Sequence, residues 1–438
     1  MDILISNATV VTMNEKLDVL FGAYLGITDG KITYLSSNAP TVKPETIIDG
    51  TGMVAMPGLV NCHTHLATTV MRSYVDDAGR TEALEQQLRT EAKLDDRSAK
   101  ASALLGIAEC LRFGITSVSD LYYYPEAVAE AAAESGIKAN VALASYRFID
   151  QCEDFDFETD DQCVEAARVA DKWHGYDNGR ISVDAGLYAE YISNYKLWEG
   201  LAAWAEEKGL GLQLHLAQTQ EEAEECLDRT GLGPGELLNV HGMFRVPTTA
   251  AGCVALSDEE RKLLGKKKVT AVTTPIAYAK AGLPTTDVLE SVKAGMNVAL
   301  GTGGAIECGN LDMFEVMRAT AMSARLSGGD ASAMPAAAVL MMATTCGARA
   351  QGRADKTGML KEGMDADIIL VDFTAPHLMP CHDIMNGLVF SAKGGDVAMT
   401  MVGGKVLYQN GCFPTIDLKQ VVGELMGYAI PRLMEEKE

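Results

Sequence analysis

The sequence predicts a (β/α)8 TIM barrel with a small β-sandwich domain that both chain termini build. Eight short apolar runs alternate with helical stretches across roughly 300 residues, which is the order of elements in a parallel barrel. Strand-like patterns without intervening helices occupy both ends of the chain. A doubly wound sheet is the alternative, but no Gly-x-Gly-x-x-Gly motif opens a helix after the first strand of the alternating region.

Residues 1–56 are expected to form the first part of the sandwich. Ile3–Thr12 is rich in strand-forming residues, and two further strand patterns, Tyr24–Thr28 and Lys31–Leu35, flank Asp29-Gly30. Aspartate followed by glycine between two such patterns indicates a hairpin, because a type I′ turn needs positive φ at both central positions. This region therefore predicts antiparallel pairing near the N-terminus.

Residues 57–357 are expected to form the barrel. Its expected strands are residues 59–61, 116–119, 139–143, 181–184, 212–215, 252–255, 269–272 and 298–301. Helical patterns between them include residues 101–113, 125–135, 197–208 and 258–264. Residues 358–412 return to strand patterns and are expected to complete the sandwich, and residues 413–438 read as a helical tail.

Composition excludes several classes of protein. The net charge of -23 repels phosphate backbones, so nucleic-acid binding is not expected. No apolar stretch reaches the length of a membrane span, and the N-terminus has neither a basic region nor an apolar signal core. The ten cysteines form no Cys-x-x-Cys pair, which is typical of reduced, packed thiols. The chain is therefore expected to be cytoplasmic, with no membrane partner.

The sharpest local signal is a His-x-His motif in the first barrel strand. His63 and His65 lie two residues apart, so in a strand both side chains point to the same face. A third histidine, His215, lies in a later strand pattern of the same region. Imidazoles that converge at strand ends suit zinc or iron, and the sequence therefore predicts one divalent metal ion, zinc or alternatively iron, held by these three residues. The other four histidines lie in loops or at helix ends, where a structural role is expected.

These motifs resemble the amidohydrolase superfamily, and within it the methylthioadenosine/S-adenosylhomocysteine deaminase and chlorohydrolase branch. The sequence Pro-Gly-Leu-Val-Asn-Cys-His-Thr-His is similar to the entry motif of that superfamily. Further similar segments follow in order, at residues 76–77, 106–117, 257–260, 301–305, 310–315, 358–367 and 376–383. The resemblance covers almost the whole chain and implies a metal-binding barrel with a sandwich built from both termini.

The resemblance also implies a deaminase apparatus that this chain keeps only in part. The three histidine ligands match His63, His65 and His215, but the proton-donating glutamate is replaced by Gln218. The water-orienting histidine of the sixth strand is replaced by Gly252, and the metal-binding aspartate of the eighth strand by Gly303.

Three further positions match residues of the family's substrate pocket. The second histidine of the sixth-strand motif is replaced by Ala255, a substrate-facing histidine by Tyr188, and a seventh-strand histidine by Thr273. The expected pocket residues are therefore Tyr188, Gly252, Ala255, Thr273 and Gly303.

Two candidate catalytic residues remain. Gln218 can hydrogen-bond a ring nitrogen but cannot deliver a proton at neutral pH. Glu307, four residues beyond Gly303, is the nearest carboxylate that could substitute as base or ligand, with a surface glutamate as the alternative interpretation.

Two functional hypotheses follow. The first is a metal-dependent hydrolase acting on a C–N bond of a purine-, pterin- or triazine-like heterocycle, with altered or impaired deaminase chemistry. The second is a catalytically inactive homologue that serves as a ligand-binding or oligomer-partner subunit. The retained histidines favour the enzyme, and by analogy with the family a homo-oligomer is expected.

Overall fold

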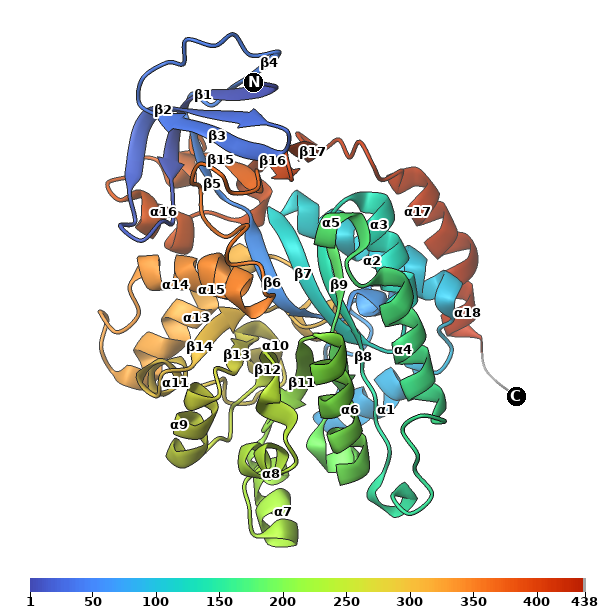
Figure 1. Ribbon diagram of the computed structural model, residues 1–438. Coiled ribbons are helices and arrows are strands. Elements are labelled where there is room, and N and C mark those ends of the chain that lie inside the picture. Colours follow the sequence, from blue (N-terminus) through green and yellow to red (C-terminus); the bar gives the residue numbers. More distant parts are fainter. Residues whose placement is uncertain (436–438) are drawn as a thin grey trace.

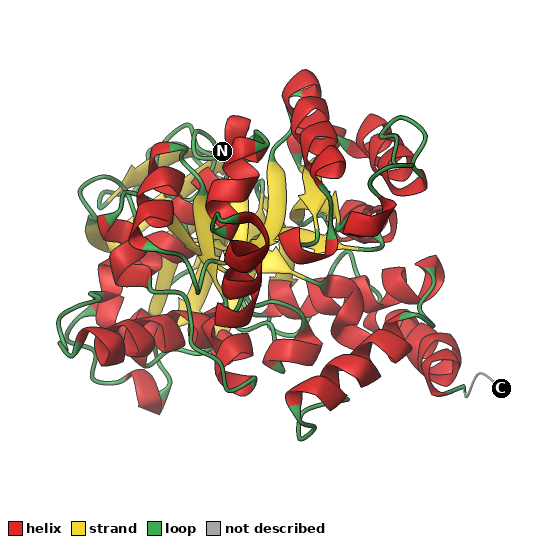
Figure 2. Ribbon diagram, turned by 90° about the horizontal axis from the view of Figure 1, so that it is seen from below, coloured by secondary structure: helices red, strands yellow, loops and turns green. Residues whose placement is uncertain are grey.

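A ring of parallel strands surrounded by helices forms the centre of the molecule, seen from below in Figure 2. The computed structural model describes residues 1–435. The strands of the ring are β6 (Leu59–Thr64), β7 (Ile115–Tyr122), β8 (Lys138–Leu143), β9 (Ile181–Val183), β10 (Ala185–Leu187), β11 (Leu212–Leu216), β12 (Thr248–Gly252), β13 (Thr270–Thr273) and β14 (Asn297–Leu300). They form one parallel sheet in the order β6-β7-β8-β9 and a second in the order β10-β11-β12-β13-β14.

Isolated parallel bridges join the two sheets into a closed ring. Thr64 pairs with Gly303 at one junction, and Ser145 pairs with Leu187 at the other. Because all strands run in parallel, their carboxyl ends meet on one side of the ring, where barrel enzymes carry their active sites. The short strands β9 and β10 together occupy the fourth position.

Helices follow the strands and cover the outside of the ring. They are α1 (Arg80–Glu91), α2 (Asp96–Arg112), α3 (Pro125–Ser135), α4 (Asp161–Trp173), α5 (Tyr176–Gly179), α6 (Tyr195–Lys208), α7 (Gln220–Thr230), α8 (Pro234–Val240), α9 (Asp258–Lys266), α10 (Pro275–Lys280), α11 (Val288–Lys293), α12 (Ala305–Cys308), α13 (Met313–Gly328), α14 (Ala336–Ala343) and α15 (Thr345–Ala350). Side chains cap several of them. For example, Asp95 accepts the Ser98 N–H at the start of α2, and Ser257 with Glu260 forms a capping box on α9.

Strands from both termini lie together in one sheet, which sits at the top of Figure 1. Its members are β1 (Ile3–Val11), β2 (Val19–Thr28), β3 (Lys31–Ser36), β4 (Thr46–Asp49), β5 (Met53–Pro57), β15 (Ile368–Asp372), β16 (Val397–Val402) and β17 (Lys405–Gln409). The order is β17-β16-β15-β5-β1-β2-β3, with β4 paired to β1. Hydrogen bonding therefore runs through a single sheet, where two facing sheets were predicted.

The predicted hairpin between β2 and β3 is present. Asp29 has a φ of 50° and Gly30 a φ of 75°, so both central residues adopt the positive φ that this turn requires. A carbon added to Gly30 would lie 2.7 Å from the Gly403 carbonyl oxygen, which gives this position a second reason to be glycine. The turn and its glycine thus fix where β2 meets β3.

Two strand predictions differ from the structure. The sixth barrel strand was expected at residues 252–255, but β12 ends at Gly252 because Gly252 (φ 100°) and Cys253 (φ 53°) leave the extended region. The three-residue strand β10 has no pattern long enough to be recognised from sequence. Both differences occur at the carboxyl ends of strands, where the chain turns toward the site.

The C-terminal segment is helical, as α17 (Leu418–Glu424), a π-helical turn (Leu425–Ala429) and α18 (Ile430–Met434). α17 packs against α2 on the outside of the barrel. Pro431 lies in the first turn of α18, where a missing N–H costs no helical hydrogen bond. Residues 436–438 of the predicted tail lie outside the described residues. A further helix, α16 (Ile384–Phe390), packs against α13 and α14.

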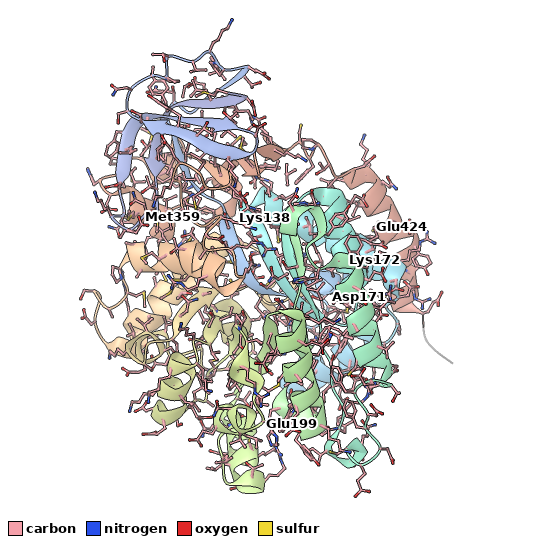
Figure 3. The ribbon with its side chains drawn as sticks, in the orientation of Figure 1. Lys138, Asp171, Lys172, Glu199, Met359 and Glu424 are labelled. Atoms are coloured by element: carbon pink, nitrogen blue, oxygen red, sulfur yellow. The ribbon has the colours of Figure 1, made fainter. Side chains whose placement is uncertain are left out.

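A buried ion-pair cluster joins the barrel to the terminal sheet. Lys138, labelled at the start of β8 in Figure 3, contacts Asp365 at 2.7 Å and Asp367 at 2.5 Å. The Asp367 side chain is fully buried and also accepts hydrogen bonds from Thr357 and from the Gly403 N–H. These contacts fasten the two parts of the molecule at the end of the barrel away from the site.

Within residues 1–435, every helix is too short or too polar to span a lipid bilayer.

Candidate metal centre

Three histidine rings meet at the carboxyl ends of β6 and β11. His63 lies in β6, His65 follows the end of that strand, and His215 lies in β11. The ring centroids are 4.7 Å apart for His63 and His65, 4.9 Å for His63 and His215, and 5.5 Å for His65 and His215. One ring nitrogen from each residue lies within 4.8 Å of the others, and all three residues are buried. The structure thus brings together the three residues predicted as metal ligands.

Backbone carbonyls fix the orientation of two of the rings. His65 Nδ1 lies 2.8 Å from the Leu121 carbonyl oxygen, and His215 Nδ1 lies 2.7 Å from the Tyr188 carbonyl oxygen. A carbonyl can only accept, so each Nδ1 carries the proton and donates it, which leaves Nε2 with a free lone pair. This is the arrangement by which metal-ligating histidines are usually held.

Burial keeps the cluster neutral. It lowers the pKa of His65 to about 4 and that of His215 to about 4. Burial, followed by the neighbouring His65 and His215, holds the pKa of His63 well below its usual value. Three neutral imidazoles therefore present lone pairs at pH 7.

The residues fit a divalent cation such as zinc. Tetrahedral zinc sites use nitrogen ligands about 2.0–2.1 Å from the ion, and catalytic sites commonly have three protein ligands and one open position. The ring nitrogens of His63, His65 and His215 are grouped closely enough to hold one metal ion. We therefore treat the cluster as a candidate three-histidine metal centre.

Asp120, at the carboxyl end of β7, positions the chain around His65. Its Oδ2 atom accepts the Leu66 N–H at 2.6 Å and the Thr64 hydroxyl at 3.0 Å, and these two residues flank His65. Burial raises the pKa of Asp120 to about 7. The sequence interpretation missed this residue, although a carboxylate at the carboxyl end of a barrel strand is itself a signal of a functional site.

Gly303 lies directly beside the first histidine. Its N–H donates to the His63 carbonyl at 3.0 Å, and it has a φ of 74°. A carbon added to Gly303 would lie 3.2 Å from Oε2 of Glu307, which belongs to the short helix α12. The same Oε2 accepts the Gly304 N–H at 2.5 Å. The carboxylate of Glu307 thus turns back toward Gly303 and the histidines.

Gly252 is confined by its neighbours. A carbon added there would lie 2.9 Å from the Leu216 carbonyl oxygen, 3.0 Å from the Tyr278 hydroxyl and 3.2 Å from Gln218 Cγ. The Tyr278 side chain is buried, so an aromatic ring occupies space next to a position where the family resemblance places a histidine. The site consequently has no room for a larger side chain at residue 252.

Glu222 holds the turn that carries Gln218. Its carboxylate accepts the Gln218 N–H at 2.7 Å and the Ala217 N–H at 3.1 Å, and Ala217 has a φ of 46°. Burial raises the pKa of Glu222 to about 7. The Ala255 N–H donates to the Ala217 carbonyl at 3.0 Å, so Ala255 supports this turn through its backbone. Glu222, too, was not predicted from sequence.

Tyrosine rings line the side of the site formed by β7 and β10. The Tyr188 ring lies 5.2 Å from His215, and the Tyr122 ring lies 5.5 Å from His65. Tyr123 is parallel to Tyr188, with ring centroids 6.2 Å apart and planes at 7°. Thr273, at the end of β13, is buried, and its carbonyl accepts the Gly301 N–H at 3.0 Å. Tyr188 is therefore the predicted pocket residue whose ring lies beside the histidines, whereas Gly303 contacts His63 through its backbone.

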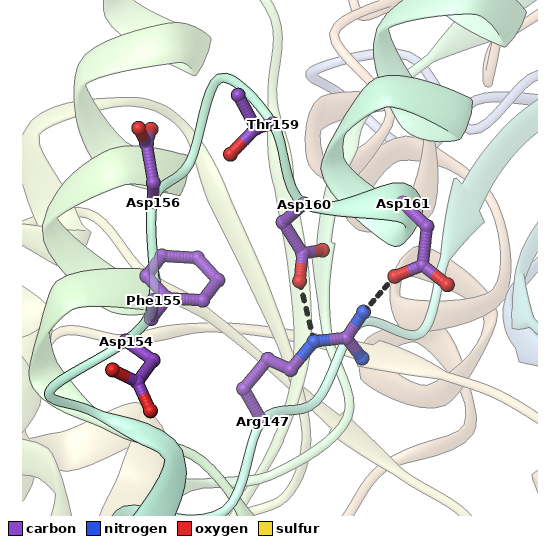
Figure 4. Close-up of a pocket in the computed structure, with 7 residues that line it drawn as sticks. All are labelled: Arg147, Asp154, Phe155, Asp156, Thr159, Asp160 and Asp161. Carbon is purple, nitrogen blue, oxygen red and sulfur yellow. Dashed lines mark hydrogen bonds and ion pairs between the residues drawn. The ribbon is translucent and has the colours of Figure 1, made fainter.

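A separate hollow on the surface has no part in this site. It has a volume of about 360 Å³ and is lined by Arg147 and mainly acidic neighbours, shown in Figure 4. Arg147 pairs with Asp160 at 2.5 Å and also with Asp161, so its charge is already neutralised. None of the residues that line this hollow belongs to the histidine cluster.

Comparison with known proteins places the geometry in a family context. The model of the amidohydrolase family matches residues 54–407. A 5-methylthioadenosine/S-adenosylhomocysteine deaminase of Acetivibrio thermocellus is 35% identical over 425 residues, covering 96% of this chain and 97% of the relative. A 5′-deoxyadenosine deaminase of Methanosarcina acetivorans is 37% identical over 424 residues, covering 97% and 96%.

Solved structures of deaminases and chlorohydrolases are similar to this chain in fold. A zinc-bound adenosine deaminase from Xanthomonas campestris superposes with a TM-score of 0.90 at 26% identity, covering 98% of each chain. A zinc complex of atrazine chlorohydrolase from Arthrobacter aurescens superposes with a TM-score of 0.89 at 25% identity, covering 97% of this chain and 99% of the other. Both similarities extend over nearly the whole fold.

Proposed function

This chain belongs to the amidohydrolase family, and from that premise we propose that it is a metal-dependent hydrolase that deaminates an adenine-like nucleoside. The observation that carries the proposal is the convergence of the neutral side chains of His63, His65 and His215, two of which are oriented by backbone carbonyls. The names of the relatives, which include deaminases of methylthioadenosine and 5′-deoxyadenosine, support the choice of substrate class. The zinc in two similar structures supports zinc as the ion.

The three histidines would hold the cation, and tyrosine rings lie beside them. When bound, a divalent cation supplies positive charge that makes an attacking water more acidic and stabilises negative charge in the transition state. The chain's own residues orient the substrate. The Gln218 carboxamide donates a hydrogen bond to a ring nitrogen, and the Tyr188 ring packs against the heterocycle beside His215.

Gln218 makes this a slow deaminase. A carboxamide stabilises charge on the ring nitrogen but transfers no proton, and loss of a general acid typically costs about 10²–10⁴ in rate. Glycine at position 252 also lacks the water-orienting imidazole that the family resemblance implies there. We therefore expect turnover well below that of an enzyme with glutamate and histidine at these positions.

The test is ammonia release by zinc-loaded protein from 5′-deoxyadenosine, 5′-methylthioadenosine and adenosine. We expect measurable turnover that disappears in the double variant His63→Asn/His65→Asn. His382→Asn, at an exposed position far along the chain, serves as the control and keeps the activity. Zinc-loaded protein that releases no ammonia from any of the three nucleosides would overturn the proposal.

The second candidate is a non-catalytic subunit that binds a nucleoside or partners another chain. The observation that favours it is the joint replacement at Gln218, Gly252 and Gly303, three positions that surround one site. Tight binding of an adenine nucleoside by calorimetry, without any turnover, would support this alternative. A homo-oligomer is proposed in either case, and light scattering of the purified protein tests it.

A further inference from the structure

The Glu307 carboxylate is half-buried beside the site and has no role in the function proposed above. It comes from α12, directly after the loop that follows β14, and its Oε2 lies 3.2 Å from where a side chain at Gly303 would begin. A side-chain carbon at Gly304 would lie 2.8 Å from the same atom and 3.1 Å from Cβ of His65. One carboxylate oxygen therefore fills the space beside Gly303 and next to the metal centre.

The charged and polar neighbours of Glu307 come from several elements. Burial raises the pKa of Glu307, whereas the Gly304 N–H, His215, the Gln87 amide and Lys280 act in the opposite direction. Gln87 also donates to the buried Glu91 at 2.8 Å, so its amide lies between two carboxylates. A glutamate that only capped a short helix would not need to lie among these groups.

Resting on the proposed function, we propose that Glu307 is the proton-accepting carboxylate of this site, supplied four residues beyond Gly303 in place of a side chain at that position. Glycine at position 303 suits this arrangement, because the residue has a φ of 74° and a side-chain carbon there would lie only 3.2 Å from Glu307 Oε2. The two residues form one coupled replacement: the carboxylate is retained, while the residue that carries it has changed.

Glu307 acts as a base outside the ligand set. The group of metal-ligating atoms that lie within 4.8 Å of one another contains His63, His65 and His215, and among the described residues it does not include a Glu307 oxygen. The carboxylate still lies next to the cluster, because a side-chain carbon at Gly304 would be 2.8 Å from Glu307 Oε2 and 3.1 Å from His65 Cβ. Three histidines consequently bind the ion, and Glu307 accepts and then donates the proton.

The step balances with one carboxylate. The oxygen of the attacking water bonds to the amino-bearing ring carbon, its proton passes to Glu307, and the electron pair of the C=N bond moves to the ring nitrogen, which accepts a hydrogen bond from Gln218. Glu307 then gives the proton to the exocyclic amino group, the ring C=N bond re-forms, and the exocyclic C–N bond breaks. Ammonia leaves, and the hydroxylated ring tautomerises to the keto form.

Glu307→Gln tests the chemistry, because the amide oxygen can still accept the Gly304 N–H and preserve the cap. We expect kcat to fall at least about 100-fold while KM and the zinc dissociation constant, measured by chelator competition, stay within about threefold. Glu315→Gln, the same change at an exposed position nearby, is the matched control and leaves all three values unchanged. Near-normal kcat in Glu307→Gln, or a zinc dissociation constant weakened 100-fold, would overturn the base assignment.

A double-mutant cycle between positions 303 and 307 tests whether the two residues share one space. It needs no catalytic turnover. Gly303→Asp is expected to lower the unfolding midpoint more in the wild-type background than in Glu307→Ala, because in the first case two carboxylates compete for one space. If the wild-type protein releases no ammonia, the proposed function fails, and this cycle alone decides whether the two positions are coupled. Equal midpoint shifts in the two backgrounds would refute the coupling.

Discussion

Acidification should unfold the metal-free protein more readily because of its three buried imidazoles. In the unfolded chain a histidine takes up a proton near pH 6.5, whereas folded His65 and His215 do so only near pH 4. Above pH 6.5 both states are neutral and folding carries no penalty. Below pH 6.5 the unfolded state binds more protons, so stability falls as the pH falls toward 4.

The expected size follows from the same values. About one pH unit below 6.5, the unfolded imidazole is roughly 90% protonated and the folded one almost not at all, which costs roughly 1.3 kcal/mol for each residue. His65 and His215 together therefore destabilise the metal-free protein by about 2–3 kcal/mol between pH 7.5 and pH 5.5. His63, whose pKa is also well below its usual value, adds to this in the same direction.

The assay is the urea midpoint of chelator-treated protein at these two pH values. Asp120 and Glu222, each with a pKa raised to about 7, act with the opposite sign, so the comparison is made between variants. His65→Asn/His215→Asn should lose the difference of about 2–3 kcal/mol, and His382→Asn, which leaves the cluster intact, should keep it. An equal response to pH in both variants would refute the reasoning, whereas saturating zinc should suppress the response in the wild-type protein.

Three further predictions concern stability and catalysis. Lys138→Met removes a buried cation from two aspartates and should lower the free energy of unfolding by about 3–5 kcal/mol. Lys31→Met removes a half-exposed partner of the same Asp365 and should lower it by under about 1 kcal/mol. Equal urea midpoints of the two variants would contradict this difference. Gly252→Ala should lower the free energy of unfolding by about 1–3 kcal/mol in the same assay. The residue has a φ of 100°, and the added carbon would lie 2.9 Å from the Leu216 carbonyl oxygen. An unchanged midpoint would mean that the turn relaxes freely. Gln218→Glu should raise kcat for nucleoside deamination at least about tenfold with zinc content unchanged, and a lower kcat would exclude a missing proton donor as the cause of slow turnover.

The sequence predicted those features that depend on local periodicity. The two-residue spacing of His63 and His65 is enough to place both rings on one face of a strand, and Asp29-Gly30 is enough to place a hairpin. The third ligand, His215, could be added because parallel strands bring their carboxyl ends to one side of a barrel. The family resemblance then placed Gly303 beside this cluster.

Features that depend on the path the chain takes after a strand ends could not be predicted from the sequence. The sixth strand was placed four residues too late because the positive φ of Cys253 leaves no mark in a run of apolar residues. Whether Glu307 faces solvent or the metal centre depends on how α12 turns back after β14, which no residue pattern records. Glu222 was missed for the same reason, since its carboxylate reaches a turn that precedes its own helix.

The most direct test of the account is the metal content of the purified protein after growth with added zinc and exhaustive dialysis. Elemental analysis should find about one zinc ion per chain in the wild-type protein, and almost none in a variant with His63, His65 and His215 all replaced by asparagine. Wild-type protein that is folded and yet holds no metal, or a triple variant that holds as much as the wild type, would contradict the three-histidine centre.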